Sequence, residues 1–180
     1  GLHFHSRPVP IAQLADAFAR QRIDMAIIGH DLLQTESYSQ CKLTESRFVY
    51  VYDEQQLRLP EPASLAELAA VPHLASNYSH KTATIIDNHF AAQGLRRRIV
   101  ATSGGITAIP AILAASPLLT ILPEVMITDH PLFERLKKVP FETGQVQVAL
   151  YLVWHKLHEH DLVQHFVRSW IIRYFAGQPD

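Results

Sequence analysis

The chain has 180 residues, of which 48% are hydrophobic, and its 16 basic side chains nearly balance 17 acidic ones. This length gives one large domain or two small ones with a real core, and the composition excludes a disordered chain. The charge balance excludes a basic nucleic-acid-binding face, and the single cysteine, Cys41, excludes a disulfide framework and a cysteine-based zinc site. No apolar run is long enough to cross a membrane. Without an apolar leader, the sequence is expected to be that of a cytoplasmic protein or of a mature fragment.

Apolar periodicity predicts that strands and helices alternate along the chain, which is typical of the α/β class. The predicted strands are residues 2–5, 23–28, 41–45, 48–52, 73–75, 99–101, 118–122, 136–140 and 145–154. The predicted helices are residues 11–20, 64–70, 80–93 and 162–174, and a further helix begins near Thr107 and includes Leu113. Ser64 and Glu67 have the spacing of a capping box, so the second helix has a defined start. A helix between two strands predicts that the strands are parallel.

Residues 98–124 have the order strand, glycine-rich turn, helix, strand, so the two strands are expected to be parallel and neighbouring. Pro110 fits only the first turn of a helix, so the regular helix is expected from about Thr107, after a looser turn. In such sheets ligands bind where strands end and helices begin. This rule makes Thr102, Ser103 and Gly104 candidate ligand-binding residues, with an ordinary tight turn as the alternative.

Three further places supply candidate ligand-binding residues. Ser79, His80, Lys81 and Thr82 stand at a helix start, where free N–H groups favour an anion, although Ser79 as a simple N-cap is the alternative. Gly29 and His30 end a strand, with a solvated loop histidine as the alternative. Gln147 is expected to point inward by alternation along its strand.

Five local patterns, in this order, resemble the effector-binding domain of LysR-type transcriptional regulators, over residues 2–175. They are a helix followed by RIDMAI (22–27), SLAELAAVP (64–72), FAAQGL (90–95), TILP (120–123), and VWHK (153–156) with the closing helix. The last pattern is similar to the branch that contains regulators of nodulation and of aromatic catabolism. Gln21 and Arg22 stand where Gly-Glu is usual, and the family's helix-turn-helix, linker helix and opening strand and helix have no counterpart here.

This resemblance implies a two-lobed fold like that of periplasmic binding proteins, with two Rossmann-like subdomains joined by crossover strands. Residues 1–52 with 156–180 would form the first subdomain and residues 53–155 the second, with the effector between them. The implied function is effector sensing and oligomerisation, as a homodimer or homotetramer. The implied effector is a weakly acidic or aromatic compound, and DNA would be bound only through the missing helix-turn-helix domain. Neither a cofactor nor a membrane is implied.

Other classes of function have less support in the sequence. A periplasmic-type solute-binding protein shares the two-lobed architecture and is the main alternative. A metal-dependent hydrolase would need a site built from histidines such as His155, His158 and His160, but these lie between a strand and a helix without regular spacing. No G-x-S-x-G, H-E-x-x-H or P-loop motif occurs, so neither an enzyme nor a metal site is predicted. Residues 96–98, three arginines, are expected to be solvated.

Overall fold

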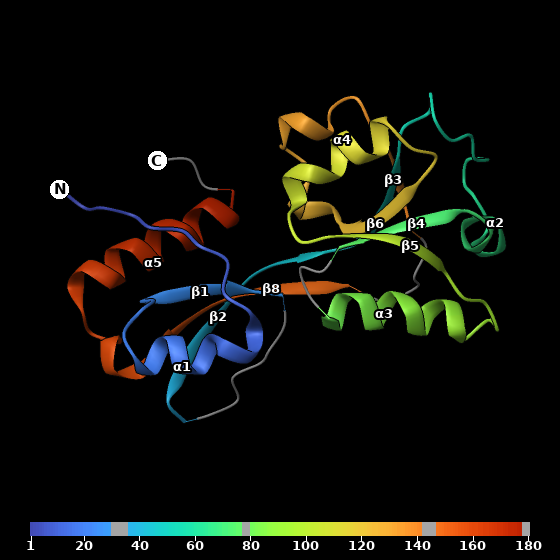
Figure 1. Cartoon of the computed structure of the whole chain (residues 1–180). Coiled ribbons are helices and arrows are strands. Elements are labelled where there is room, and N and C mark those ends of the chain that lie inside the picture. The colour runs from blue at the N-terminus through green and yellow to red at the C-terminus, as the bar shows by residue number, and fades with distance from the viewer. Residues whose placement is uncertain (30–35, 77–79, 142–146, 178–180) are drawn as a thin grey trace. The chain divides into compact units, whose positions relative to one another are not determined.

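The chain divides into two compact units in the computed structural model (Figure 1). The structure describes residues 1–29, 36–76, 80–141 and 147–177. The first unit consists of Gly1–Thr44 and Ala149–Asp180, and the second of Glu45–Val148. Strands β2 (Tyr38–Ser46) and β8 (Val148–His155) each continue from one unit into the other. The chain therefore passes between the units within strands.

The first unit is built on a three-stranded sheet in the order β1-β8-β2, in which β1 (Met25–Ile28) runs antiparallel to β8. A 3-10 turn, η1 (Ile11–Gln13), leads into α1 (Leu14–Ala19), and the chain closes with η5 (Lys156–His158) and α5 (Leu162–Phe175). Its core cluster consists of Leu14, Phe18, Ile28 and Val153. The predicted amphipathic helix after Pro10 is confirmed, since Leu14, Ala17 and Phe18 are buried.

The second unit is built on a five-stranded sheet in the order β5-β4-β6-β3-β7. These strands are β5 (Arg98–Ser103), β4 (Pro72–Ser76), β6 (Leu119–Pro123), β3 (Phe48–Tyr52) and β7 (Lys137–Pro140). Both β5 and β6 are parallel to β4, whereas β3 is antiparallel to β6 and β7. The strands β3 and β6 are buried along their whole length, which agrees with their continuous apolar runs.

Helices cover both faces of this sheet. On one face α2 (Leu65–Ala70) and α3 (His80–Ala91) contribute Leu68, Ile86 and Phe90 to a core cluster with Tyr50 and Ile121 of the sheet. On the other face are α4 (Ile109–Ala114) and the 3-10 turns η3 (Glu124–Met126) and η4 (Pro131–Phe133). Figure 1 shows α3 and α4 on opposite sides of β4 and β5. The α/β prediction is confirmed.

The predicted strand–helix–strand unit of residues 98–124 needs one correction. Both of its strands, β5 and β6, are parallel to β4, so the predicted parallel direction is right. The prediction that they are neighbours is wrong, because β4 lies between them. The helical segment therefore crosses over a strand that comes earlier in the chain, and local periodicity carries no information about that insertion. The late helix start is confirmed: η2 (Ile106–Ala108) precedes α4, and Pro110 lies in its first turn.

Residues 2–5 do not form the predicted strand, and the parallel pair that they were expected to make with residues 23–28 is absent from the described chain. Leu2 and Phe4 are exposed. A strand requires a neighbour for its N–H and C=O groups, and the described sheet of this unit contains only β1, β8 and β2. Strand-type side chains alone do not supply that partner.

The unit boundaries fall earlier in the chain than the resemblance suggested. The expected boundaries lay after Tyr52 and before Lys156, whereas the structure has them after Thr44 and after Val148. The reason is pairing: β3 lies between β6 and β7 of the second unit, and residues 151–154 of β8 pair with β1 in the first. No described helix is long and apolar enough to cross a membrane.

Candidate functional site

The carboxyl ends of β4 and β5 are the best-defined candidate binding edge. Ser76, the last residue of β4, is the Cα partner of Ser103, the last residue of β5. The helices that follow these two neighbouring strands, α3 and α4, pack on opposite faces of the sheet. Helices that diverge in this way leave room beyond the strand ends, which is where ligands bind in open α/β sheets. The sheet topology thus singles out this edge without reference to side-chain chemistry.

The turn after β5 is held by its own serine. Ser103 is buried, and its hydroxyl donates a 2.8 Å hydrogen bond to the carbonyl oxygen of Gly105 and accepts a 3.4 Å one from the Gly105 N–H. Thr102, in contrast, is exposed on the neighbouring position. A Cβ added to Gly104 or Gly105 would meet nothing within 4 Å, so the backbone of the turn faces open space. Thr102 and the glycine backbone are therefore accessible, while the hydroxyl of Ser103 is already used within the turn.

The start of α3 lies at the same sheet edge. The helix begins at His80, so the backbones of His80, Lys81 and Thr82 form its first turn, as predicted. Ser79 lies outside the described residues. The first N–H groups of a helix have no partner within the helix, and the helix dipole makes this end favourable for an anion. The β4–β5 pairing thus places the end of β5, with Thr102, beside the end of the strand that precedes α3. A role of His80 and Thr102 in one binding site stays a prediction.

The start of α4 offers less than the sequence suggested. Its first residues, Ile109 and Pro110, are both buried, and proline has no N–H group. Only η2, with exposed Thr107 and Ala108, intervenes between the glycine turn and this buried helix start. Anion binding at this side of the edge would therefore rest on the glycine turn and not on the N-terminus of α4.

The other predicted site residues lie elsewhere. Gly29 is half-buried directly after β1 in the first unit, and His30 lies outside the described residues. Gln147 immediately precedes β8 and is exposed, so the strand on which its inward direction was based begins one residue later. The strand predicted at residues 73–75 ended one residue too early, so Ser76 was not among the predicted site residues. Its place opposite Ser103 follows from the register of β4 and β5. The sequence signal for Ser76 is that it is a polar residue directly after an apolar strand.

A buried histidine lies away from this edge. His73 of β4 is fully buried, its Nε2 is 2.9 Å from the carbonyl oxygen of Leu68, and its ring meets Phe90 edge-on. Its Nδ1 has no hydrogen-bond partner. Burial lowers the pKa of His73 to about 4, and nearby Arg97 acts in the same direction, while the Leu68 carbonyl and Asp87 oppose them. His73 is therefore a neutral core residue at pH 7.

Arg97 corrects the expectation of a solvated arginine run. Its side chain is 3% exposed, its Nε donates a 2.8 Å hydrogen bond to Oδ1 of Asp87, and its Nη2 lies 2.7 Å from the same oxygen. The guanidinium also lies 6.0 Å from the centre of the Phe90 ring. Arg97 is thus tied to α3, whereas the flanking Arg96 and Arg98 are exposed as expected.

The predicted absence of a metal site stays a prediction. The contacts of His155 and His158 are ordinary hydrogen-bond and ring contacts. Nδ1 of His155 accepts a 3.1 Å hydrogen bond from the Leu157 N–H, so that nitrogen is already occupied. The rings of His155 and His158 are 6.5 Å apart at a steep angle. Within the described ranges, no three His, Cys, Asp or Glu side chains are grouped as metal ligands would be.

Comparison with known proteins gives one family over nearly the whole chain. The family model described as the LysR substrate binding domain matches residues 1–171. Nodulation protein D 1 of Sinorhizobium fredii (strain NBRC 101917 / NGR234) is 24% identical over 115 residues, which are 64% of this chain and 36% of that protein. The chain thus spans about a third of the length of this curated relative.

Solved structures show the same fold. The regulatory domain of MexT, a transcriptional activator in Pseudomonas aeruginosa, matches with a TM-score of 0.72 at 16% identity, over 89% of this chain and 76% of that one. The reduced regulatory domain of OxyR2 from Vibrio vulnificus gives 0.69 at 14% identity, over 91% and 77%. Full-length CbnR complexed with its target DNA gives 0.71 at 15% identity, over 93% and 56%. At these identities the likeness concerns the two-lobed α/β fold alone.

Proposed function

Because the chain belongs to the LysR substrate binding domain family, we propose that it is the effector-sensing domain of a LysR-type transcriptional regulator. The match over residues 1–171 is the observation that carries this proposal. The role is binding and not catalysis, and DNA would be bound by a different segment of the full-length regulator, acting in the cytoplasm. The solute-binding alternative shares the fold but is disfavoured by the family match.

We place the effector at the carboxyl ends of β4 and β5. The backbone N–H groups at the start of α3 favour a carboxylate or a similar anion. Thr102 and the exposed backbone of Gly104 can add hydrogen bonds from the second strand end. A small, weakly acidic and partly apolar molecule, such as an aromatic acid, suits this combination. The roles of Gly29, His30, Ser79 and Gln147 in binding stay predictions.

The proposed mechanism is a shift between conformations. An effector changes the state of the domain only by the difference between its affinities for the two states. A contact with α3 and the β5 turn that forms better in one state would favour that state. In the full-length regulator the change would alter the spacing of the attached DNA-binding segments.

Calorimetry with a panel of aromatic and aliphatic carboxylic acids tests the site. We expect the His80 imidazole and the Thr102 hydroxyl each to add one hydrogen bond to an acid that binds. His80→Ala and Thr102→Ala should therefore each weaken binding roughly tenfold. Matched controls are His165→Ala, an exposed histidine of α5, and Thr84→Ala, an exposed threonine further along α3. Unchanged affinity in both site variants would place the effector elsewhere. Binding of neutral sugars or amino acids, with no acid bound, would favour the solute-binding alternative.

We also propose that the domain forms a dimer through α1 and α3, the helices expected from the family's side-by-side pairing. The outward side of α1 carries Ala15, Asp16 and Ala19, and that of α3 carries Thr84, Asp87 and Asn88. Small and polar side chains of this kind suit close approach of two helices. Sedimentation at micromolar concentration should show a dimer that Ala15→Arg converts to monomer. A monomer in the unaltered chain would contradict this pairing.

A further inference from the structure

The connection between β2 and β3 is a single residue, Arg47. Arg47 lies just inside the second unit, which begins at Glu45. It joins β2, which continues from the first unit, to β3, which is fully buried. Residues at the ends of elements commonly absorb the dihedral changes of a hinge. By position alone, Arg47 would therefore be a natural hinge between the two units.

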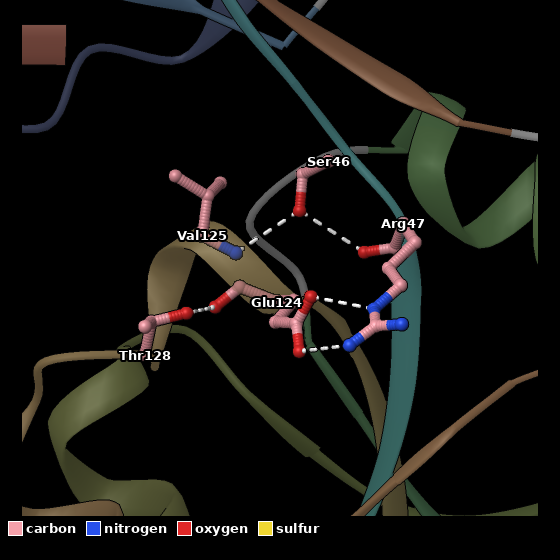
Figure 2. Close-up of polar contacts among 5 residues, drawn as sticks. All are labelled: Ser46, Arg47, Glu124, Val125 and Thr128. Atoms are coloured by element: carbon pink, nitrogen blue, oxygen red, sulfur yellow. Dashed lines mark hydrogen bonds and ion pairs between the residues drawn. The ribbon is translucent and has the colours of Figure 1, made fainter. Parts of the chain in front are cut away.

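The contacts of this residue oppose such a role. The Arg47 guanidinium donates two hydrogen bonds to the Glu124 carboxylate, from Nε at 2.6 Å and from Nη2 at 2.9 Å (Figure 2). The Arg47 carbonyl oxygen accepts from the Glu124 N–H at 2.9 Å and from the Ser46 hydroxyl at 3.0 Å. That hydroxyl accepts in turn from the Val125 N–H at 3.0 Å. We call Ser46, Arg47, Glu124 and Val125 the Arg47 clamp.

The other side of the clamp is itself fixed. Glu124 and Val125 open the 3-10 turn η3 directly after the buried strand β6, and Phe48 of β3 is the Cα partner of Pro123. The Thr128 hydroxyl donates a 2.9 Å hydrogen bond to the Glu124 carbonyl oxygen, which holds the turn (Figure 2). The clamp thus joins the start of β3 to the end of its sheet neighbour by side-chain and main-chain bonds together.

We infer that the Arg47 clamp immobilises the β2–β3 connection, so that the end of β2 moves as a rigid part of the second unit. Any bending between the units at this crossing then occurs before Ser46, within β2. The ion pair is half-exposed, with 57% of the Arg47 side chain and 36% of the Glu124 side chain accessible. An ion pair this exposed adds little to the free energy of unfolding. Several bonds with defined directions at one residue fix geometry instead.

Distance measurement between two spin labels tests this inference. Labels at Arg173→Cys on α5 and Ala111→Cys on α4, in a Cys41→Ser background, report on the two units, and dilution with unlabelled chain removes distances between copies. Arg47→Ala, Glu124→Gln and Ser46→Ala should each widen the distribution of label distances. The exchange of Arg47→Glu with Glu124→Arg should narrow it again, because the ion pair is restored in reverse.

The matched control is Arg20→Ala, which breaks the exposed Arg20–Asp16 ion pair of α1 and should leave the width unchanged. Circular dichroism confirms that each variant is folded, and Glu124→Gln keeps the side-chain shape if Arg47→Ala does not fold. Unchanged widths in folded clamp variants would overturn the inference, as would equal widening by Arg20→Ala. This test needs no effector, so its outcome is independent of the proposed binding site.

Discussion

Ser76 and Ser103 are Cα partners at the carboxyl ends of the parallel strands β4 and β5. This pairing brings two loops that are distant in sequence to one edge of the sheet, and it does so through main-chain hydrogen bonds. The side chains at this edge then lie in different environments. Ser103 is buried and bonded within its turn, whereas Thr102 is exposed.

Ser103→Ala and Thr102→Ala should therefore have different effects on stability. Ser103→Ala removes the hydroxyl that bonds Gly105, so the free energy of unfolding should fall by about 1 kcal/mol. Thr102→Ala removes an exposed side chain and should change it by less than about 0.5 kcal/mol. Urea unfolding of both variants measures the difference. Equal losses would mean that the turn is not held by Ser103.

The buried His73 should make the second unit sensitive to acid. Its folded-state pKa of about 4 lies below the ordinary value of 6.5, so between these values the unfolded chain binds more protons than the folded one. The free energy of unfolding thus keeps its full contribution from His73 above pH 6.5. It falls as the pH drops toward 4, by about 3 kcal/mol at most. His73→Leu should flatten this dependence, although loss of the bond to Leu68 lowers stability at neutral pH. An unchanged slope would assign the acid sensitivity to other groups.

Two aspartates of equal exposure should contribute unequally to stability. The side chains of Asp87 and Asp16 are both 48% exposed, but Asp87 pairs with the 3% exposed Arg97, whereas Asp16 pairs with the 70% exposed Arg20. Asp87→Ala leaves a buried guanidinium without its carboxylate and should cost about 1.5–3 kcal/mol. Asp16→Ala should cost clearly less, because Arg20 and Arg22, the two arginines that pair with Asp16, are both exposed to solvent. Chemical denaturation of the two variants, side by side, provides the comparison.

The capping box of α2 gives a fourth prediction. The Ser64 hydroxyl accepts from the Glu67 N–H at 3.3 Å, and the Glu67 carboxylate accepts from the Ser64 N–H at 2.7 Å and from its hydroxyl at 2.6 Å. These bonds hold the pKa of Glu67 below its usual value. Ser64→Ala should lower the free energy of unfolding by about 1 kcal/mol, measured by thermal denaturation. Ser64→Asp keeps an N-cap acceptor and should recover most of the loss.

Features that depend on neighbouring residues were predictable from sequence. The capping box at Ser64 and Glu67 and the late start of α4 imposed by Pro110 follow from local rules. So does the end of α3 at Ala91, shortly before Gly94, whose φ is 69°. The candidate edge could be proposed as well, because β5 and α3 were both predicted, although the predicted ends of β4 and β5 lay one and two residues too early. Local rules were therefore enough to predict most of the helices and strands, whereas the site residues stay predictions.

Features that depend on distant partners were not predictable. Nothing near β5 or β6 indicates that β4 lies between them, because strand order is decided by which hydrophobic faces pack. The burial of Arg97 depends on Asp87 and Phe90 of α3, and the place of β3 in the second unit depends on β6 and β7. Residues 2–5 have strand-type side chains without a described partner. In each case the deciding contact lies outside the local window.

Both tryptophans of the chain, Trp154 and Trp170, belong to the first unit. Trp154 is buried, its Nε1 donates a 2.8 Å hydrogen bond to Glu159, and Arg168 lies 4.8 Å from the centre of its ring, whereas Trp170 is half-exposed. Intrinsic tryptophan emission thus originates entirely in one of the two units. Far-ultraviolet dichroism, by contrast, averages over the helices of both. A spectroscopist following the two signals together can read whether the units melt in one step or in succession, without introducing any dye.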